Sequence, residues 1–204
     1  MTISLQNTGK RFNREWIFRN FSYQFDAGNA YAITGANGAG KSTLLQVLAG
    51  ATLHNEGSIS ASVNGKPIAT DNLYNYIAIS APYLELIEEM TALEFLDFHS
   101  KFKPLSQTPD IILSSVDLSN AAKKQIRYYS SGMKQRLKLA QAFYTEAPIL
   151  LLDEPTTNLD ASGIAIYLQL VQLLTKDRLV IVSSNNADEY RFCNAEVTLG
   201  DYKK

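Results

Sequence analysis

A glycine-rich stretch near the N-terminus has the residue types and spacing of a phosphate-binding loop. It runs Gly35-Ala36-Asn37-Gly38-Ala39-Gly40-Lys41-Ser42 and matches the pattern G-x-x-x-x-G-K-[ST] throughout. Glycines let backbone N–H groups turn toward phosphate oxygens, the lysine reaches the β- and γ-phosphates, and the serine hydroxyl holds Mg²⁺. An apolar run, 30–34, precedes the loop and a helical run, 43–49, follows it. The sequence therefore predicts a nucleoside triphosphate site rather than a glycine turn without a ligand.

Two carboxylates follow a second apolar run. Ile149–Leu152 predicts a buried strand, and Asp153 and Glu154 come directly after it. At the end of a strand beside the phosphate loop, an aspartate can hold the Mg²⁺ shell while the next carboxylate orients or deprotonates a water molecule. We therefore expect Asp153 to be a metal-site residue and Glu154 to be the general base. The alternative is that two acidic residues merely end a strand.

The composition is that of one α/β domain. The chain has 204 residues, 46% of them hydrophobic, which is enough for one well-buried domain and short for two. Its 19 Lys and Arg nearly balance its 20 Asp and Glu, so we do not expect nucleic acid as a partner. Cys193 is the only cysteine, which excludes an internal disulfide and a four-cysteine zinc site.

The N-terminus and the hydropathy pattern indicate where the protein acts. Residues 1–6 lack the charged and apolar regions of a signal peptide, and no stretch approaches the roughly 18 apolar residues of a membrane span. We expect a soluble, cytoplasmic protein that acts at a membrane, if at all, by docking on another chain.

Strand-like and helical patterns alternate along the chain. Short strands are expected at 3–5, 21–25, 30–34, 58–63, 66–68 and 77–80, with Asn64-Gly65 as a tight hairpin turn. Helical patterns dominate from about 81 to 147. Strands return at 149–152 and 179–182 around an apolar helix over 164–174, an order typical of parallel strands.

These patterns predict a single α/β domain over 1–204 with a P-loop NTPase core. The core comprises about 1–80 and 148–204 and contains a mostly parallel sheet and an N-terminal antiparallel β subdomain. A helical subdomain over about 81–147 is inserted into it.

A third motif lies between the phosphate loop and the two carboxylates. It reads Tyr129-Ser130-Ser131-Gly132-Met133-Lys134-Gln135-Arg136, and its serines precede a helix as caps. With the phosphate loop and the segment 153–160, whose sequence is DEPTTNLD, this order of motifs resembles that of ATP-binding-cassette (ABC) ATPases over essentially the whole chain. Ser130 and Gly132 match the serine and the second glycine of the family's L-S-G-G-Q signature. The version in this chain resembles that of exporter-type cassettes more than that of importer-type ones.

The resemblance implies a mechanism built on two subunits. In the family, two nucleotide-binding domains enclose two ATP molecules, each held by the phosphate loop of one chain and the signature of the other. The implied cofactors are ATP and Mg²⁺. The implied partners are a second ABC ATPase subunit, identical or different, and an integral-membrane transporter subunit. Residues 158–160 resemble the loop that crosses the dimer interface.

The resemblance also assigns individual residues. Phe12 matches the aromatic position that stacks on adenine; Trp16 is the alternative, and either could instead belong to the core. The implied nucleotide contacts are Phe12, Gly35, Ala36, Asn37, Gly38, Ala39, Gly40, Lys41, Ser42, Thr43, Ser130 and Gly132. Ser42 and Asp153 are the implied metal residues, and Lys41, Glu154 and Asn185 the implied catalytic residues.

Two positions depart from the family pattern. Asn185 stands where the switch histidine belongs, and Ala81 and Pro82 stand where the glutamine after strand 77–80 belongs. Both γ-phosphate sensors are therefore altered. An amide can donate a hydrogen bond but cannot carry the charge of an imidazolium, so we expect slow hydrolysis by the isolated subunit.

The sequence thus predicts the ATPase subunit of an ABC transporter, peripheral on the cytoplasmic face of the inner membrane. Docking on the membrane subunit is expected around Tyr83, Leu84, Leu86 and Ile87, residues that could equally be subdomain core. The alternative function is an ATP-dependent assembly switch without transport, in which hydrolysis is incidental. Copurification of a membrane protein would separate the two.

Overall fold

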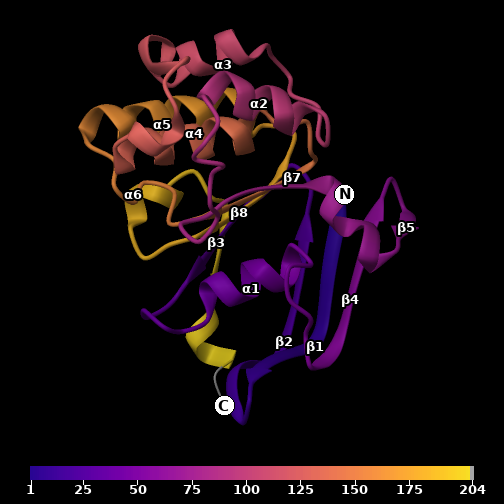
Figure 1. Ribbon diagram of the computed structural model, residues 1–204. Helices are drawn as coiled ribbons and strands as arrows, with labels where there is room; N and C mark the ends of the chain where they lie inside the picture. The colour runs from indigo at the N-terminus through magenta and orange to yellow at the C-terminus, as the bar shows by residue number, and fades with distance from the viewer. Residues whose placement is uncertain (203–204) are drawn as a thin grey trace. The chain divides into compact units, whose positions relative to one another are not determined.

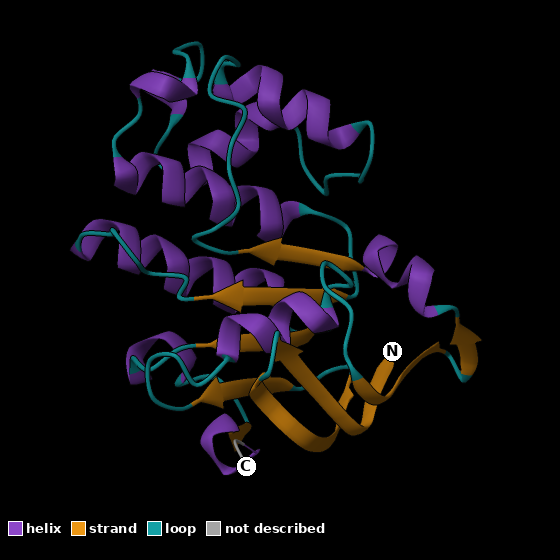
Figure 2. Ribbon diagram, turned by 60° about the horizontal axis from the view of Figure 1, so that its bottom comes forward, coloured by secondary structure: helices purple, strands orange, loops and turns teal. Residues whose placement is uncertain are grey.

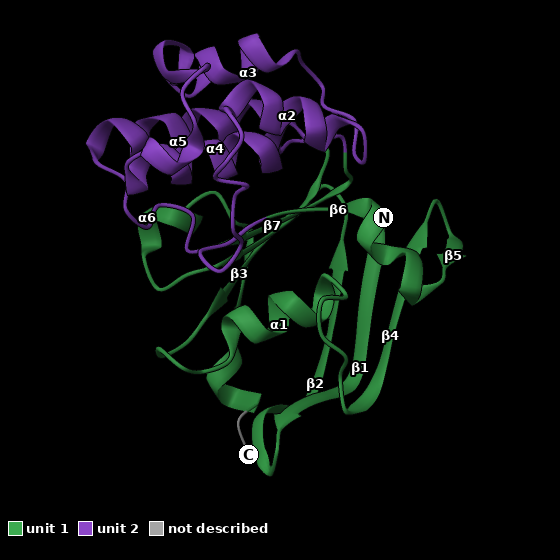
Figure 3. Ribbon diagram, in the orientation of Figure 1, with its two compact units in different colours: residues 1–79, 147–153, 177–204 green, residues 80–146, 154–176 purple. Residues whose placement is uncertain are grey.

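A computed structural model describes residues 1–202, which form two compact units (Figure 3). Unit 1 comprises Met1–Ile79, Ala147–Asp153 and the chain from Asp177 onward, and unit 2 comprises Ser80–Glu146 and Glu154–Lys176. The structure shows an α/β fold with an antiparallel sheet, a parallel sheet and helices, as expected. The boundaries that we drew at residues 81 and 147 remain a prediction.

The antiparallel sheet of unit 1 has the strand order β2-β1-β4-β5 (Figure 1). Its strands are β1 (Thr2–Phe12), β2 (Glu15–Asp26), β4 (Glu56–Val63) and β5 (Lys66–Ile68). Asn64 and Gly65 both have positive φ, 50° and 75°, which suits the tight turn predicted between β4 and β5. One face of β1 and β2 is apolar and buried, including Ile3, Leu5 and Phe21, so this sheet contributes to the core of unit 1.

The parallel sheet has the strand order β6-β7-β8-β3-β9. Figure 2 draws the strands of the structure as orange arrows. Its strands are β3 (Ala30–Thr34), β6 (Ile77–Ser80), β7 (Ile149–Asp153), β8 (Leu179–Ser183) and β9 (Ala195–Thr198). Every residue of β7 and β8 is buried, as continuous apolar runs predict for strands covered on both faces. β7 and β8 pair in parallel, which confirms the prediction for this pair. Helix α1 (Lys41–Leu48) contacts both of them.

Unit 2 is helical. Its helices are α2 (Ala92–Ser100), α3 (Pro109–Ser115), α4 (Ser131–Tyr144) and α5 (Ala161–Leu174), with 3₁₀ turns at Ser119–Ala121 and Ile126–Tyr128. Thr91 and Glu94 form a capping box that starts α2. α5, which the sequence analysis grouped with the core, packs on α4, and the rings of Phe143 and Tyr167 lie 6.2 Å apart.

Three short elements of unit 1 complete the described chain. They are the 3₁₀ turns Thr70–Tyr76 (η1) and Leu199–Tyr202 (η4), and helix α6 (Ala187–Tyr190). None of the helices in residues 1–202 is both long enough and apolar enough to cross a bilayer.

Candidate nucleotide-binding site

The register of the parallel sheet brings three predicted site segments to one edge of unit 1. Ile33 of β3 pairs with Ser183 of β8, and Ser183 pairs with Asp153 of β7. The phosphate loop starts two residues after Ile33, and Asn185 follows two residues after Ser183. Because the carboxyl ends of parallel strands meet at one edge, the loop, Asp153 and Asn185 share that edge, where α/β sheets bind ligands.

The backbone of the phosphate loop has the conformation that its glycines allow. Gly35, Gly38 and Gly40 all have positive φ, at 139°, 78° and 98°. At Gly40 a Cβ would also lie 2.3 Å from Cγ2 of Ile17, a residue of β2. The loop therefore packs so closely on the antiparallel sheet that only glycine fits at this position. Directly after it, α1 begins, with the N–H of Leu44 donating to the carbonyl of Gly40 at 2.9 Å.

Lys41 is buried and lies against the loop that it terminates. Its side chain is 6% exposed, and Nζ donates to the carbonyl oxygens of Gly35 (2.8 Å) and Ala36 (3.3 Å). The ammonium group is thus held within the curve of the loop by backbone oxygens. This is the position from which a lysine can reach phosphate oxygens bound to the loop amides.

The donor set fits Mg²⁺ held jointly by protein and phosphate. Asp153 is 1% exposed at the end of β7, and Ser42 lies in the first turn of α1. Within residues 1–202, no group of three or more His, Cys, Asp or Glu side chains could hold a metal by itself. Mg²⁺ characteristically uses one or two protein oxygens together with substrate phosphates and water. The Ser42 hydroxyl and the Asp153 carboxylate provide this kind of partial coordination.

Asn185 is attached to the phosphate loop by its side chain. Its Nδ2 donates to Oδ1 of Asn37 at 2.8 Å, and both residues are exposed. The backbone contributes as well, since the N–H of Ser184 donates to the carbonyl of Ile33 at 3.2 Å. The bond between the two asparagines was not predicted from the sequence. It leaves one N–H of the Asn185 amide available to a ligand at the loop.

Glu154 has a strained backbone. Its φ is 43°, a value that residues with a Cβ rarely adopt, and its side chain is exposed. Its Oε2 lies at the limit of hydrogen-bond distance, 3.5 Å, from the hydroxyl of Thr157. Strained residues of this kind concentrate at functional sites, where the surrounding structure holds them. The observation supports a functional role for Glu154 over a chance acidic strand end.

The signature motif forms the N-terminus of α4 in unit 2. Ser130 is the N-cap and its Oγ accepts a hydrogen bond from the N–H of Met133 at 3.3 Å. A Cβ on Gly132 would lie 3.1 Å from the carbonyl oxygen of Asn158, so glycine permits the close approach of the 158–160 loop. Nε2 of Gln135 donates to the carbonyl of Pro155 at 2.8 Å and fixes the same loop to α4. No role for Gln135 was predicted from the sequence.

The structure distinguishes the two aromatic candidates for adenine stacking. Phe12 is 48% exposed, with Nζ of Lys10 4.7 Å from the centre of its ring. The ring of Trp16 instead lies under two guanidinium groups, those of Arg11 at 5.5 Å and Arg19 at 4.6 Å. Phe12 is therefore the more accessible ring and stays our prediction for the stacking residue.

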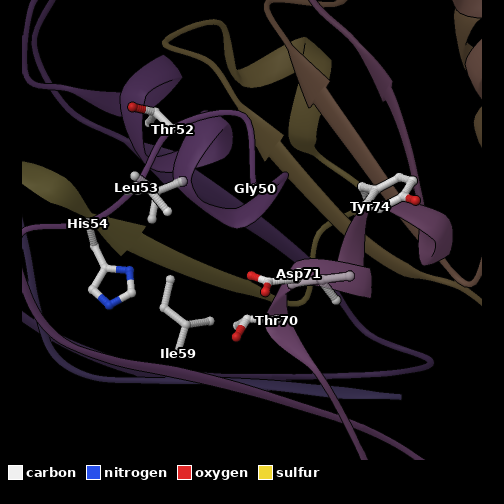
Figure 4. Close-up of a pocket in the computed structure, with 10 residues that line it drawn as sticks. Gly50, Thr52, Leu53, His54, Ile59, Thr70, Asp71 and Tyr74 are labelled. Atoms are coloured by element: carbon white, nitrogen blue, oxygen red, sulfur yellow. The ribbon is translucent and has the colours of Figure 1, made fainter.

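A separate pocket of unit 1 contains none of the predicted site residues. It has a volume of about 150 Å³ and lies between the end of α1, β4 and η1. Figure 4 shows Leu53, His54 and Ile59 along one side of it and Asp71 on the other. His99, in unit 2, is hydrogen-bonded to Thr145 and Gln141. The structure thus gives separate surroundings to the two histidines of the chain, neither of which the sequence analysis assigned to the switch position.

A phosphate loop that opens a helix beside parallel strands, with a buried aspartate ending a nearby strand, defines a P-loop nucleoside triphosphatase. The sequence profile of one family, described as ABC transporter, matches residues 18–157. The chain belongs to this family and is an ATP-binding, ATP-hydrolysing subunit of an ABC transporter.

Individual relatives agree with this assignment. The chain is similar to the uncharacterized ABC transporter ATP-binding protein YybJ of Bacillus subtilis, with 32% identity over 191 residues, 92% of this chain and 87% of that protein. It is 34% identical over 161 residues to the cytochrome c biogenesis ATP-binding export protein CcmA of Xanthomonas oryzae pv. oryzae, covering 78% of this chain and 74% of that one. It spans only 59% and 62% of two longer Bacillus subtilis relatives.

The fold has close counterparts among solved structures. A putative ABC transporter ATP-binding protein from Pyrococcus furiosus superimposes with a TM-score of 0.83 over 100% of both chains, at 20% sequence identity. At this identity the likeness concerns the fold alone.

Proposed function

We propose that this subunit binds Mg²⁺-ATP at the carboxyl edge of its parallel sheet and hydrolyses it while paired with a second ATP-binding subunit. The observation that carries the proposal is the register of the parallel sheet, in which Ile33, Ser183 and Asp153 lie side by side on adjacent strands. This register brings the phosphate loop, Asp153 and Asn185 to one edge of the sheet. Family membership supports ATP as the nucleotide.

The proposal gives each candidate residue a role. The loop amides and the Lys41 ammonium bind the phosphates, and Ser42 and Asp153 would hold Mg²⁺. The ion would supply positive charge that offsets the negative charge of the phosphates. Glu154 orients and deprotonates the attacking water, and the Asn185 amide donates to the γ-phosphate.

The second subunit supplies the signature in this proposal. Ser130 is exposed, and it caps a helix whose N-terminus carries partial positive charge. A γ-phosphate held by the partner's phosphate loop would meet these donors, so ATP would join the two subunits. The names of several relatives refer to export or transport, for instance "Nod factor export ATP-binding protein I" and "Lantibiotic transport ATP-binding protein SrtF".

We also propose that closure of the ATP-bound pair drives transport through a separate integral-membrane subunit, on which this subunit docks at the cytoplasmic face of the inner membrane. The docking segment expected from the sequence divides by exposure. Tyr83 and Ile87 are 40% and 37% exposed, whereas Leu86 is 8% exposed. Tyr83 and Ile87 therefore suit docking, and Leu86 suits the core of unit 2.

Binding of a fluorescent ATP analogue tests the site. Lys41→Ala should weaken binding roughly 100-fold, because it removes the only side-chain cation of the loop. Lys66→Ala is the matched control, since it removes one positive charge from an exposed position on β5 of the same unit. Equal affinities for the wild type and Lys41→Ala would refute the assignment. Equal losses in both variants would show that net charge alone is responsible.

A further inference from the structure

Residues 81–90, which we call the strap, pair at their C-terminal end with residues 126–127, which lie just before the signature. Both segments belong to unit 2. At the far end of the strap, the N–H of Ile126 donates to the carbonyl of Met90 (2.9 Å) and that of Arg127 to the carbonyl of Glu88 (3.0 Å). An isolated bridge between Thr91 and Gln125 continues the pairing. The strap is thus fixed to the backbone only three residues before Ser130.

The near end of the strap is held by α4 itself. Nζ of Lys138 donates to the carbonyls of Pro82 (3.1 Å) and Ala81 (3.4 Å), and Lys134, one turn earlier, pairs with Glu88. Positions 130, 134 and 138 recur every four residues and lie along one stripe of the helix. Between strap and helix lies a cavity of about 300 Å³, lined by Pro82, Leu84, Glu85, Leu86, Glu88, Lys134 and Lys138.

Lys138 differs from Lys134 in its surroundings. Burial lowers the pKa of Lys138, while the nearby Glu85 carboxylate opposes this shift. The side chains of Lys134 and Glu88 are 28% and 49% exposed, so their ion pair is screened by water. Lys138 is thus attached to the backbone of the strap, whereas Lys134 is attached to a partly exposed side chain.

We propose that Lys138 is a positioning residue, which holds the start of the strap against α4 and thereby sets the orientation of the helix N-terminus that carries Ser130. Ala81 and Pro82 are the residues that stand where the family's sensor glutamine belongs. Lys138 therefore links the altered sensor segment directly to the signature helix. The inference rests on the proposed function for its effect on turnover, but the link itself can be tested without nucleotide.

Steady-state phosphate release tests the effect on turnover. Lys138→Met keeps the length and the apolar stem of the side chain but removes the ammonium. It should lower kcat about ten-fold and leave KM for ATP within about two-fold, because Lys138 belongs to the signature helix and not to the phosphate loop. Lys138→Arg should restore most of kcat, since a guanidinium can donate to the same carbonyls. Lys123→Met, at an exposed position of unit 2, should match the wild type.

Hydrogen exchange without nucleotide tests the link independently of hydrolysis. Lys138→Met should speed exchange at amides 83–90 and also at Met133 and Lys134, whose N–H groups donate to Ser130. A wild-type kcat in Lys138→Met, failure of arginine to restore it, or faster exchange confined to the strap would overturn the proposal. If no variant and no wild-type protein hydrolyses ATP, the proposed function fails, and exchange alone decides the role of Lys138.

Discussion

Asn185 and Asn37 hold one another through a single amide hydrogen bond of 2.8 Å. This bond gives the position after β8 a defined orientation toward the phosphate loop without a positive charge. An imidazole at the same position could become cationic and stabilise charge that develops on the γ-phosphate. A histidine at this position would therefore stabilise the transition state of hydrolysis more than the bound ground state.

We predict that Asn185→His raises kcat by roughly 10- to 100-fold with little change in ATP affinity. Loss of a complete transition-state donor commonly costs about 10²–10³-fold, and asparagine is a partial substitute for histidine. Phosphate release and analogue binding, measured on both proteins, are the readouts. Asn185→Ala is the control, and it should fall below the wild type. If histidine lowers kcat or leaves it unchanged, the site is already adapted to asparagine and the slow-ATPase expectation loses its basis.

At the scale of the elements, the contact between the phosphate loop and β2 requires glycine at position 40, and this requirement can be tested. Gly40→Ala combines a positive φ with a clash against Ile17. We expect it to lower the free energy of unfolding by about 2 kcal/mol or more and to abolish ATP binding. Denaturant unfolding is the measurement. Gly50→Ala has a φ of 72° but no neighbour within 4 Å of the added Cβ, so it should cost only about 1 kcal/mol.

The double variant Ile17→Ala/Gly40→Ala separates the two causes of this loss. Removing the Ile17 side chain relieves the clash but not the backbone strain, so the combined cost should be smaller than the sum of the single costs. Simple additivity would mean that the contact with Ile17 is unimportant.

The elements also show what the sequence could predict. The bounds of β3, β5 and β6 agree with the predicted ranges, because each is a short run limited by glycines, asparagines or a change of period. β1 and β2 are much longer than predicted. Residues such as Asn7 and Asn20, with φ of 48° and 56°, interrupt the alternation of apolar and polar residues by which a strand is predicted. β9 was not predicted, since it has a single buried apolar residue, Val197, and depends on pairing with β3.

The candidate site divides in the same way. The phosphate loop, Asp153 and Glu154 were predicted because local sequence alone specifies a strand, a glycine loop and a carboxylate. The contact of Ile17 with Gly40 and the bond of Asn185 to Asn37 were not, because they join residues 23 and 148 positions apart. The preference for Phe12 over Trp16 also needed the structure, since it depends on the exposure of Phe12 and on the positions of Arg11 and Arg19 over Trp16.

For the whole molecule, the proposed mechanism requires two subunits that ATP holds together. Glu154→Gln should remove the general base, slow hydrolysis roughly 10²–10⁴-fold and so trap an ATP-bound dimer. Size-exclusion chromatography with and without Mg²⁺-ATP measures this, and Glu154→Gln/Lys41→Ala is the control that should stay monomeric. A Glu154→Gln protein that remains monomeric at high concentrations of ATP and protein would argue against a homodimer and leave pairing with a different ATPase subunit.

The cluster around Trp16 has a practical consequence for all of these measurements. Trp16 is the only tryptophan of the chain, and its neighbour Ile17 touches the phosphate loop at Gly40. The guanidinium groups of Arg11 and Arg19 lie over its indole, and Arg19 is fixed there by an ion pair with Glu56. The protein thus carries an intrinsic optical reporter on the strand whose Ile17 contacts the loop. Its fluorescence reads out a single location, so unlabelled wild type and variants can be compared by the same signal.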